Sequence, residues 1–198
     1  MNEDRTQRLE SVLAVLLGLA AIITAFAAYQ ASLKDGDTVK SYNEGIRSLS
    51  DANQFYNQAI QQVNRDEGVF LEWAKADQEG NTDLRDYLEA GLMDENLTAA
   101  MEEFKKRDDL LSPIAADSYV SADQAEGERL ERQTRQKFAQ AQELDDEGDG
   151  YELVGVIGAV SLFFLGIAGV FRSPRMRLVA AAIGGVVLLV AGVLLAGA

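Results

Sequence analysis

Residues 151–198 decide the fold, and their sequence is YELVGVIGAVSLFFLGIAGVFRSPRMRLVAAAIGGVVLLVAGVLLAGA. Two uncharged apolar runs, 153–171 and 178–198, are separated by a link that carries Arg172, Arg175 and Arg177. About 20 apolar residues in a helix span the ~30 Å hydrocarbon core of a bilayer. We therefore expect a transmembrane hairpin, with spans at 151–171 and 178–198 and a basic loop at 172–177.

The N-terminus contains a third apolar run of membrane length. Residues 11–29 follow a polar head, residues 1–10, and Thr24 is their only polar interruption. A cleaved signal peptide is the alternative, because Ala25-Phe26-Ala27 has the small-residue spacing of a cleavage site. The run is longer than the ~7 to 15 residues of a signal-peptide core, which favours an uncleaved transmembrane helix.

The basic residues at the ends of these runs predict the orientation. Short segments rich in Lys or Arg remain on the cytoplasmic side of a membrane. The arginines of the 172–177 loop and Arg5 and Arg8 of the head both follow this rule. We expect a multi-pass protein in the lipid of the plasma membrane, with its N-terminus inside, its C-terminus outside and residues 30–150 outside the cell.

The composition excludes several classes of function. The 198 residues include 18 basic and 32 acidic residues, and neither Cys nor His. Disulfides, thiolate nucleophiles, histidine relays and imidazole ligands are therefore excluded. Residues 30–150 contain 13 basic and 28 acidic residues, a net charge of −15. Such a surface repels phosphate backbones, so we expect no nucleic-acid partner.

A repeat of apolar residues follows a helix break or kink expected at Lys34–Asp37. Its steps alternate between three and four residues, which is typical of a coiled-coil helix and predicts one over about 37–79. The seam consists of Val39, Tyr42, Ile46, Leu49, Tyr56, Ile60, Val63 and Phe70. Asn53 occupies one position of the repeat, where it either sets the register of pairing or lies in a wet seam.

Shorter helices complete the predicted fold. Thr82 and Asp94 are expected N-caps of two short helices, and a helix over about 121–147 leads back to the membrane. No alternating strand pattern occurs. The predicted fold class is all-α, with three transmembrane helices and an all-helical extramembrane domain inserted between the first and the second.

Acidic residues near the second span were considered as a metal site. Asp145, Glu147 and Asp149 resemble the beginning of a calcium loop, but the twelfth position is Val156 instead of an acid. A solvated acidic surface is the preferred interpretation. We expect no metal and no cofactor.

Small residues spaced four apart occur in all three runs. They include Gly18, Gly155, Ala159, Gly184 and Gly185. This spacing lets helices approach closely, either within one chain or between copies. Because three spans and a seamed helix leave much helical surface to cover, we expect a homo-oligomer.

The spans contain no group suited to coupled transport. Residues 11–29, 153–171 and 178–198 lack Asp, Glu, Lys and Arg, whereas pumps place ionisable groups at this depth. No phosphate loop or nucleophile motif occurs, so we expect no enzyme activity. The expected function is an interaction or scaffold subunit whose acidic domain contacts a protein partner. The alternative is an oligomeric passive channel with an acidic vestibule that attracts cations.

Two segments resemble a known group of proteins. Val69-Phe70-Leu71-Glu72-Trp73 and the run from Tyr151 through FFLGIAG at 163–169 are similar to a family of uncharacterised prokaryotic three-span membrane proteins. The resemblance implies a helical extracytoplasmic domain and supplies no activity. The order of spans is also similar to that of proton-channel stator subunits, which place the large domain in the cytoplasm; the arginine loop here predicts the opposite.

Overall fold

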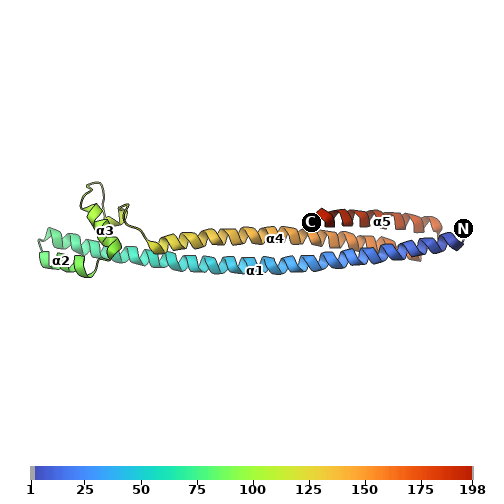
Figure 1. The fold of residues 1–198 in the computed structure, drawn as a ribbon, viewed down its shortest axis with the longest axis horizontal. Coiled ribbons are helices and arrows are strands. Elements are labelled where there is room, and N and C mark those ends of the chain that lie inside the picture. Colours follow the sequence, from blue (N-terminus) through green and yellow to red (C-terminus); the bar gives the residue numbers. More distant parts are fainter. Residues whose placement is uncertain (1–2, 198) are drawn as a thin grey trace. The chain divides into compact units, whose positions relative to one another are not determined.

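The chain is built from helices. Its structure, a computed structural model, describes residues 3–197, with side chains from residue 7 onward. The elements are α1 (Glu3–Gln78), α2 (Thr82–Gly91), α3 (Glu95–Phe104), the short 3-10 helix η1 (Pro113–Ala115), α4 (Ala122–Val170) and α5 (Pro174–Gly197) (Figure 1). No strand occurs within residues 3–197. The all-α prediction is confirmed for this part of the chain.

Three of these helices are long and apolar enough to cross a membrane. They are α1, α4 and α5, and each contains one of the apolar runs read from the sequence. The prediction of three membrane-length helices is confirmed. This arrangement is consistent with a multi-pass membrane protein.

Of the break or kink expected at Lys34–Asp37, the break is wrong, because α1 continues through these residues. An interior glycine costs a helix only about 1 kcal/mol relative to alanine. Gly36 lies on an exposed face, while Ala31 and Thr38 on either side of it are buried. The helix expected over about 121–147 is part of a longer one, since α4 runs unbroken from Ala122 to Val170 and includes the following apolar run. Packing along two long helices outweighs the local tendency of glycine to end them.

The helices form two compact units. The apolar unit comprises Met1–Asn43 and Lys137–Ala198, and the acidic unit comprises Glu44–Gln136. Both α1 and α4 contribute to each unit, because the boundaries fall inside these helices.

In the apolar unit, α1 and α4 run antiparallel and α5 packs beside them. Lys34 pairs with Glu147, and the rings of Tyr42 and Phe138 lie 5.9 Å apart. A later residue of α1 therefore contacts an earlier residue of α4, as expected for antiparallel helices. The main buried cluster consists of Leu13, Ala20, Leu165, Ala168, Ala180 and Leu188.

In the acidic unit, α2 and α3 pack against the end of α1. Phe70 and Trp73 lie in the core with Leu88, Leu97 and Met101. The rings of Phe70 and Phe104 meet edge to face at 5.1 Å, a favourable geometry for aromatic pairs. The main buried cluster of this unit thus lies around one end of α1.

Side-chain caps set the beginnings of the two short helices. Asp94 accepts a hydrogen bond from the Leu97 N–H at 2.9 Å and caps α3, as predicted. The N-cap of α2 is Asn81, which accepts from the Leu84 N–H at 3.1 Å. The prediction of Thr82 as this cap is wrong by one residue, because Asn81 offers an equally good acceptor one position earlier.

Candidate functional site

Small side chains line the face of α1 that pairs with α4. Its buried positions recur every seven residues at Ala31, Thr38, Gly45, Ala52 and Ala59. Within the acidic unit, the Ser48 hydroxyl donates to the main-chain carbonyl of Leu130 at 3.0 Å. A side chain as short as serine reaches the backbone of a neighbouring helix only where the two helices lie very close together. The paired face therefore depends on small residues.

The predicted seam lies one residue further along α1 than this buried face. Val39, Ile46 and Ile60 are 59%, 56% and 57% exposed, and Tyr42 and Leu49 are each 38% exposed. Tyr56 and Val63 are half-buried, and Phe70 is buried in the core. Val39, Ile46 and Ile60 thus flank the close pairing of α1 and α4 and remain more than half exposed, whereas Tyr56, Val63 and Phe70 are partly or fully covered.

The part of this series that lies within the acidic unit before Phe70 is called the apolar stripe. Its residues are Ile46, Leu49, Asn53, Tyr56, Ile60 and Val63. A groove of about 330 Å³ lies at the far end of the stripe, between α1 and the beginning of α4, and is lined by Tyr56, Ala59, Ile60, Val63 and Gln124. The stripe is therefore apolar along its length and hollowed at this end.

Glycines on the inner faces of the helices permit close contacts. A Cβ atom added to Gly184 would lie 2.7 Å from Cγ of Leu165 and 3.0 Å from the Leu165 backbone nitrogen. The Ser161 hydroxyl donates to the Gly184 carbonyl at 2.8 Å. Gly158 is in similarly close contact with Thr24. Gly158 was not singled out from the sequence, since its neighbour lies more than a hundred residues away.

The other predicted packing residues face outward. Gly18, Gly155 and Gly185 have no heavy atom within 4 Å of an added Cβ, and Ala159 is exposed. These faces of the helices are not covered by the described part of the chain. Their role in packing between copies remains a prediction.

The arginines that predict the orientation lie at one end of the apolar unit. Arg177 pairs with Glu10 of α1 at 3.3 Å, and its side chain is only 13% exposed. Arg172, Arg175 and Arg8 are exposed; the side chain of Arg5 lies outside the described residues. The ion pair brings the arginine link to the same end as the beginning of α1.

The acidic residues considered for calcium do not converge. Successive helical residues are rotated by about 100°, so Asp145 and Asp149 share a face of α4 whereas Glu147 lies about 200° from Asp145. Glu147 is occupied by Lys34, and this hydrogen bond raises the pKa of the lysine. Within residues 3–197 no group of three or more His, Cys, Asp or Glu side chains could hold a metal ion.

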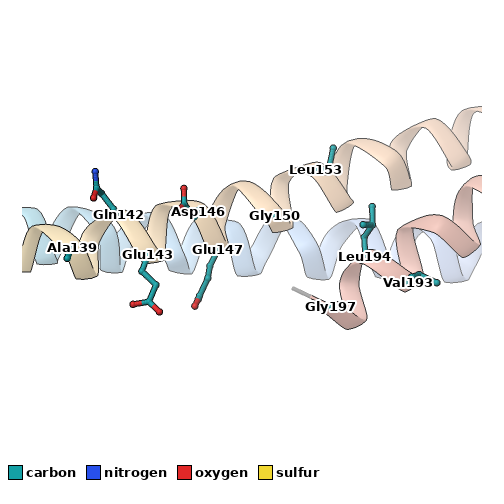
Figure 2. A pocket seen from close by; sticks show the side chains of 10 residues that line it. All are labelled: Ala139, Gln142, Glu143, Asp146, Glu147, Gly150, Leu153, Val193, Leu194 and Gly197. Atoms are coloured by element: carbon teal, nitrogen blue, oxygen red, sulfur yellow. The ribbon is translucent and has the colours of Figure 1, made fainter.

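An open groove of about 800 Å³ lies in the apolar unit where α5 ends beside α4 (Figure 2). Gln142, Glu143 and Asp146 line its polar part, and Leu153 and Leu194 line its apolar part. The lining changes from acidic to apolar near Gly150. This change matches the passage from water to hydrocarbon at a membrane surface.

A buried ionic cluster fastens the acidic unit. The Asp66 side chain is fully buried, and it accepts hydrogen bonds from Arg65 at 2.7 and 2.9 Å and from the Tyr119 hydroxyl at 2.8 Å. Arg65 also pairs with Asp94 at 2.8 Å. Burial, followed by the bond to Asp66, raises the pKa of Tyr119. The cluster joins α1, the cap of α3 and the segment before α4, and sequence reasoning missed it because Asp66 and Tyr119 lie far apart in the chain.

A second polar cluster holds the segment that follows α3. Glu103 accepts hydrogen bonds from the Ser118 N–H at 3.0 Å and from Arg107 at 2.8 Å. Arg107 also pairs with Asp109 at 2.7 Å. Hydrogen bonds from Ser118, and then from Arg107, lower the pKa of Glu103 to about 2. These contacts attach the irregular segment to the end of α3.

We expect this attachment to depend on pH in the acidic range. The folded pKa of Glu103 lies below its ordinary value of 4.5, so its contribution to stability is complete above pH 4.5 and is lost as the pH falls toward 2. An NMR titration of the Glu103 carboxyl should give a midpoint near 2, with the Ser118 amide signal changing over the same range. In an Arg107→Met variant the midpoint should rise. A native midpoint near 4.5 would contradict the proposed contacts.

Together the fold and these surfaces define a class: an all-helical protein with three helices able to cross a membrane and a separate acidic helical unit. Comparison of the chain with known protein families, with curated proteins and with solved structures finds no match.

Proposed function

We propose that this chain is a multi-pass protein of the plasma membrane that acts as an interaction or scaffold subunit. Residues 1–10 and 172–177 lie in the cytoplasm, and residues 30–150 form an acidic helical domain outside the cell. The observation that carries the proposal is the apolar stripe. Ile46 and Ile60 are more than half exposed and lie, with Leu49, on the same face of α1.

The energetic cost of this exposure supports an interaction role. Burying an isoleucine or leucine side chain is worth about 1.5–3 kcal/mol relative to leaving it in water. Three such residues in the stripe, Ile46, Leu49 and Ile60, retain much of their exposure. A contiguous apolar surface of this kind is typical of a binding face.

The ion pair between Arg177 and Glu10 supports the orientation. It joins the arginine link to the beginning of α1, so the two basic segments lie on the same side of a membrane crossed by these helices. Each segment is predicted by its charge to remain in the cytoplasm. Two predictions drawn from distant parts of the chain are therefore compatible with one structure.

The groove near Gly150 supports the position of the membrane surface. Acidic residues line it before Gly150 and apolar residues line it afterwards. Charged side chains in hydrocarbon are costly, so the acidic part is expected to lie in water. This boundary agrees with a second span that begins at residue 151.

The second candidate is a passive channel formed by several copies. The observation that favours it is the uncovered small residues of the spans, Gly18, Gly155 and Gly185, which leave room for close contacts between copies. An acidic domain above such a channel would concentrate cations. Cation-selective single-channel currents from the purified protein in planar bilayers would favour this candidate over the scaffold.

Single-cysteine variants test the location of the acidic domain. The chain contains no cysteine, so a membrane-impermeant thiol reagent added to intact cells reports on one introduced site. Glu72→Cys, in the acidic unit, should be labelled, and Ser173→Cys, in the arginine link, should be labelled only after the cells are permeabilised. Both positions are exposed, which makes them a matched pair.

The reverse labelling pattern would overturn the proposed orientation. If Ser173→Cys reacted in intact cells while Glu72→Cys did not, the acidic domain would be cytoplasmic. The arrangement similar to that of stator subunits would then be the better description.

A further inference from the structure

We propose that the apolar stripe is a self-association surface on which α1 packs in parallel against α1 of a second copy of this chain. This inference rests on the proposed membrane location and names the partner of the interaction surface. Val63 and Tyr56 form one edge of the surface, where the groove lies, and Ile46 and Ile60 form its exposed crest.

The charge of the chain favours a second copy as the occupant. The protein has a net charge of −14, so two copies repel each other over most of their surfaces. Between residues 48 and 64 the only charged residue is Asp51. This uncharged stretch is where two identical acidic chains can approach without like-charge repulsion, whereas a cationic partner would find little there to bind.

The neighbouring surface of α4 is also balanced in charge. Glu131 pairs with Arg135, and it accepts a hydrogen bond from the Tyr56 hydroxyl at 2.9 Å. Glu128 lies 4.0 Å from Arg132. Acids beside the stripe are therefore matched by arginines of the same helix, and they add no net repulsion between copies.

The membrane determines the direction of pairing. Two copies inserted in one bilayer have the same orientation, so α1 of one copy runs parallel to α1 of the other. A two-fold axis along the membrane normal then places each stripe residue opposite the same residue of the second copy. Two acidic units would meet along α1, with each α4 on the outside.

The spacing of the stripe fits a parallel two-stranded coiled coil. Ile46, Asn53 and Ile60 are seven residues apart, and Leu49, Tyr56 and Val63 form the second series. A single Asn among apolar residues at such positions fixes register and favours pairing of two strands, because its amide hydrogen-bonds to that of its counterpart. On this surface Asn53 would fix the register of the two helices. On an exposed helix of a monomer it would have no such function.

Oxidative cross-linking tests the contact directly. In isolated membranes, Asn53→Cys should form a disulfide-linked dimer, because identical residues of a parallel pair face each other. The matched control is Gln58→Cys, which is also exposed but lies on the opposite side of α1. We expect about tenfold more cross-linked dimer from Asn53→Cys than from Gln58→Cys, owing to the higher effective concentration of the facing thiols.

Charge substitutions test the contact without cross-linking. Ile60→Glu places a carboxylate in the proposed interface and should weaken the dimer about tenfold or more in detergent solution, whereas Gln58→Glu adds the same charge outside it and should leave the dimer intact. Equal cross-linking of the two cysteine variants, no dimer from Asn53→Cys, or cross-linking of Asn53→Cys to a different protein would each overturn the inference.

The cross-link also separates this inference from the proposed orientation. Parallel pairing of two copies in one membrane is the same whichever side the acidic unit faces. If the labelling pattern were reversed, the Asn53→Cys dimer would still be expected. If no cross-linked dimer formed, the labelling pattern would still be expected.

Discussion

Replacing Gly184 by alanine is expected to loosen the packing of α5 against α4, whereas the same replacement at Gly185 should not loosen it. The added methyl group at residue 184 would lie 2.7 Å from Cγ of Leu165 and 3.0 Å from the Leu165 backbone nitrogen. Leu165 is fully buried, so it cannot move away without disturbing its other contacts. Overpacking of this kind costs about 1–3 kcal/mol.

Gly185 is the control because it is the next residue of the same helix and differs from Gly184 in the direction of its added Cβ. No heavy atom lies within 4 Å of a Cβ added there. The gain in helix propensity on replacing glycine by alanine is about 1 kcal/mol at either position, so the difference between the two variants isolates the steric contact. The hydrogen bond from Ser161 to the Gly184 carbonyl adds to the expected loss at residue 184.

A buried cysteine provides the measurement. Ala180 is 5% exposed in the same interface, and in an Ala180→Cys background a thiol reagent reacts only when α5 opens away from its neighbours. Relative to Gly185→Ala, Gly184→Ala should raise the rate of reaction by about fivefold to a hundredfold, as expected for about 1–3 kcal/mol of local stability. Equal rates in the Gly184→Ala and Gly185→Ala variants would show that the close contact does not stabilise this unit.

The apolar runs and their lengths were sufficient to predict three membrane-length helices and an all-α fold. Each run satisfies a requirement of length and composition that needs no knowledge of neighbouring segments. The cap at Asp94 was also predictable, because a helix N-terminus is satisfied by a side chain within three residues. Both features could be predicted from the sequence because they depend only on residues within about one helical turn or on the average composition of a segment.

The paired face of α1 could not be read in this way. The three-four repeat follows the large residues such as Ile46 and Ile60, and these lie beside the pairing with α4. The helices instead meet through small residues such as Gly45 and Ala52, which give no periodic hydrophobic signal. Helices approach closely where their side chains are small, and a search for large apolar residues does not detect such positions.

Glycine also has different effects in different contexts. The stretch Lys34–Asp37, which contains Gly36, predicts a break or kink, although α1 continues through it and Gly36 lies on an exposed face. Gly158, which nothing in its neighbouring sequence marks as important, is in close contact with Thr24 of another helix. Which of the two situations holds depends on tertiary contacts that are distant in the sequence.

Replacing Arg65 of the buried ionic cluster by methionine should lower the free energy of unfolding of the acidic unit. Asp66 is fully buried and would keep only the hydrogen bond from Tyr119. Removing one partner of a buried ion pair costs about 3–5 kcal/mol when both groups are buried. Arg65 is 55% exposed, so solvent screening reduces its share, and we expect about 2–3 kcal/mol.

Trp73 allows this loss to be measured in the intact protein. It is the only tryptophan and lies in the core of the acidic unit, so its fluorescence during denaturant unfolding reports on that unit and not on the spans. Arg129→Met, which breaks an exposed pair with Glu126, should change stability by less than about 0.5 kcal/mol. A double variant, Arg65→Met with Asp66→Leu, should recover part of the lost stability, because no carboxylate is then buried unpaired. If the double variant were no more stable than Arg65→Met alone, the loss would come from the contact between Arg65 and Asp94, and the buried carboxylate would not be its cause.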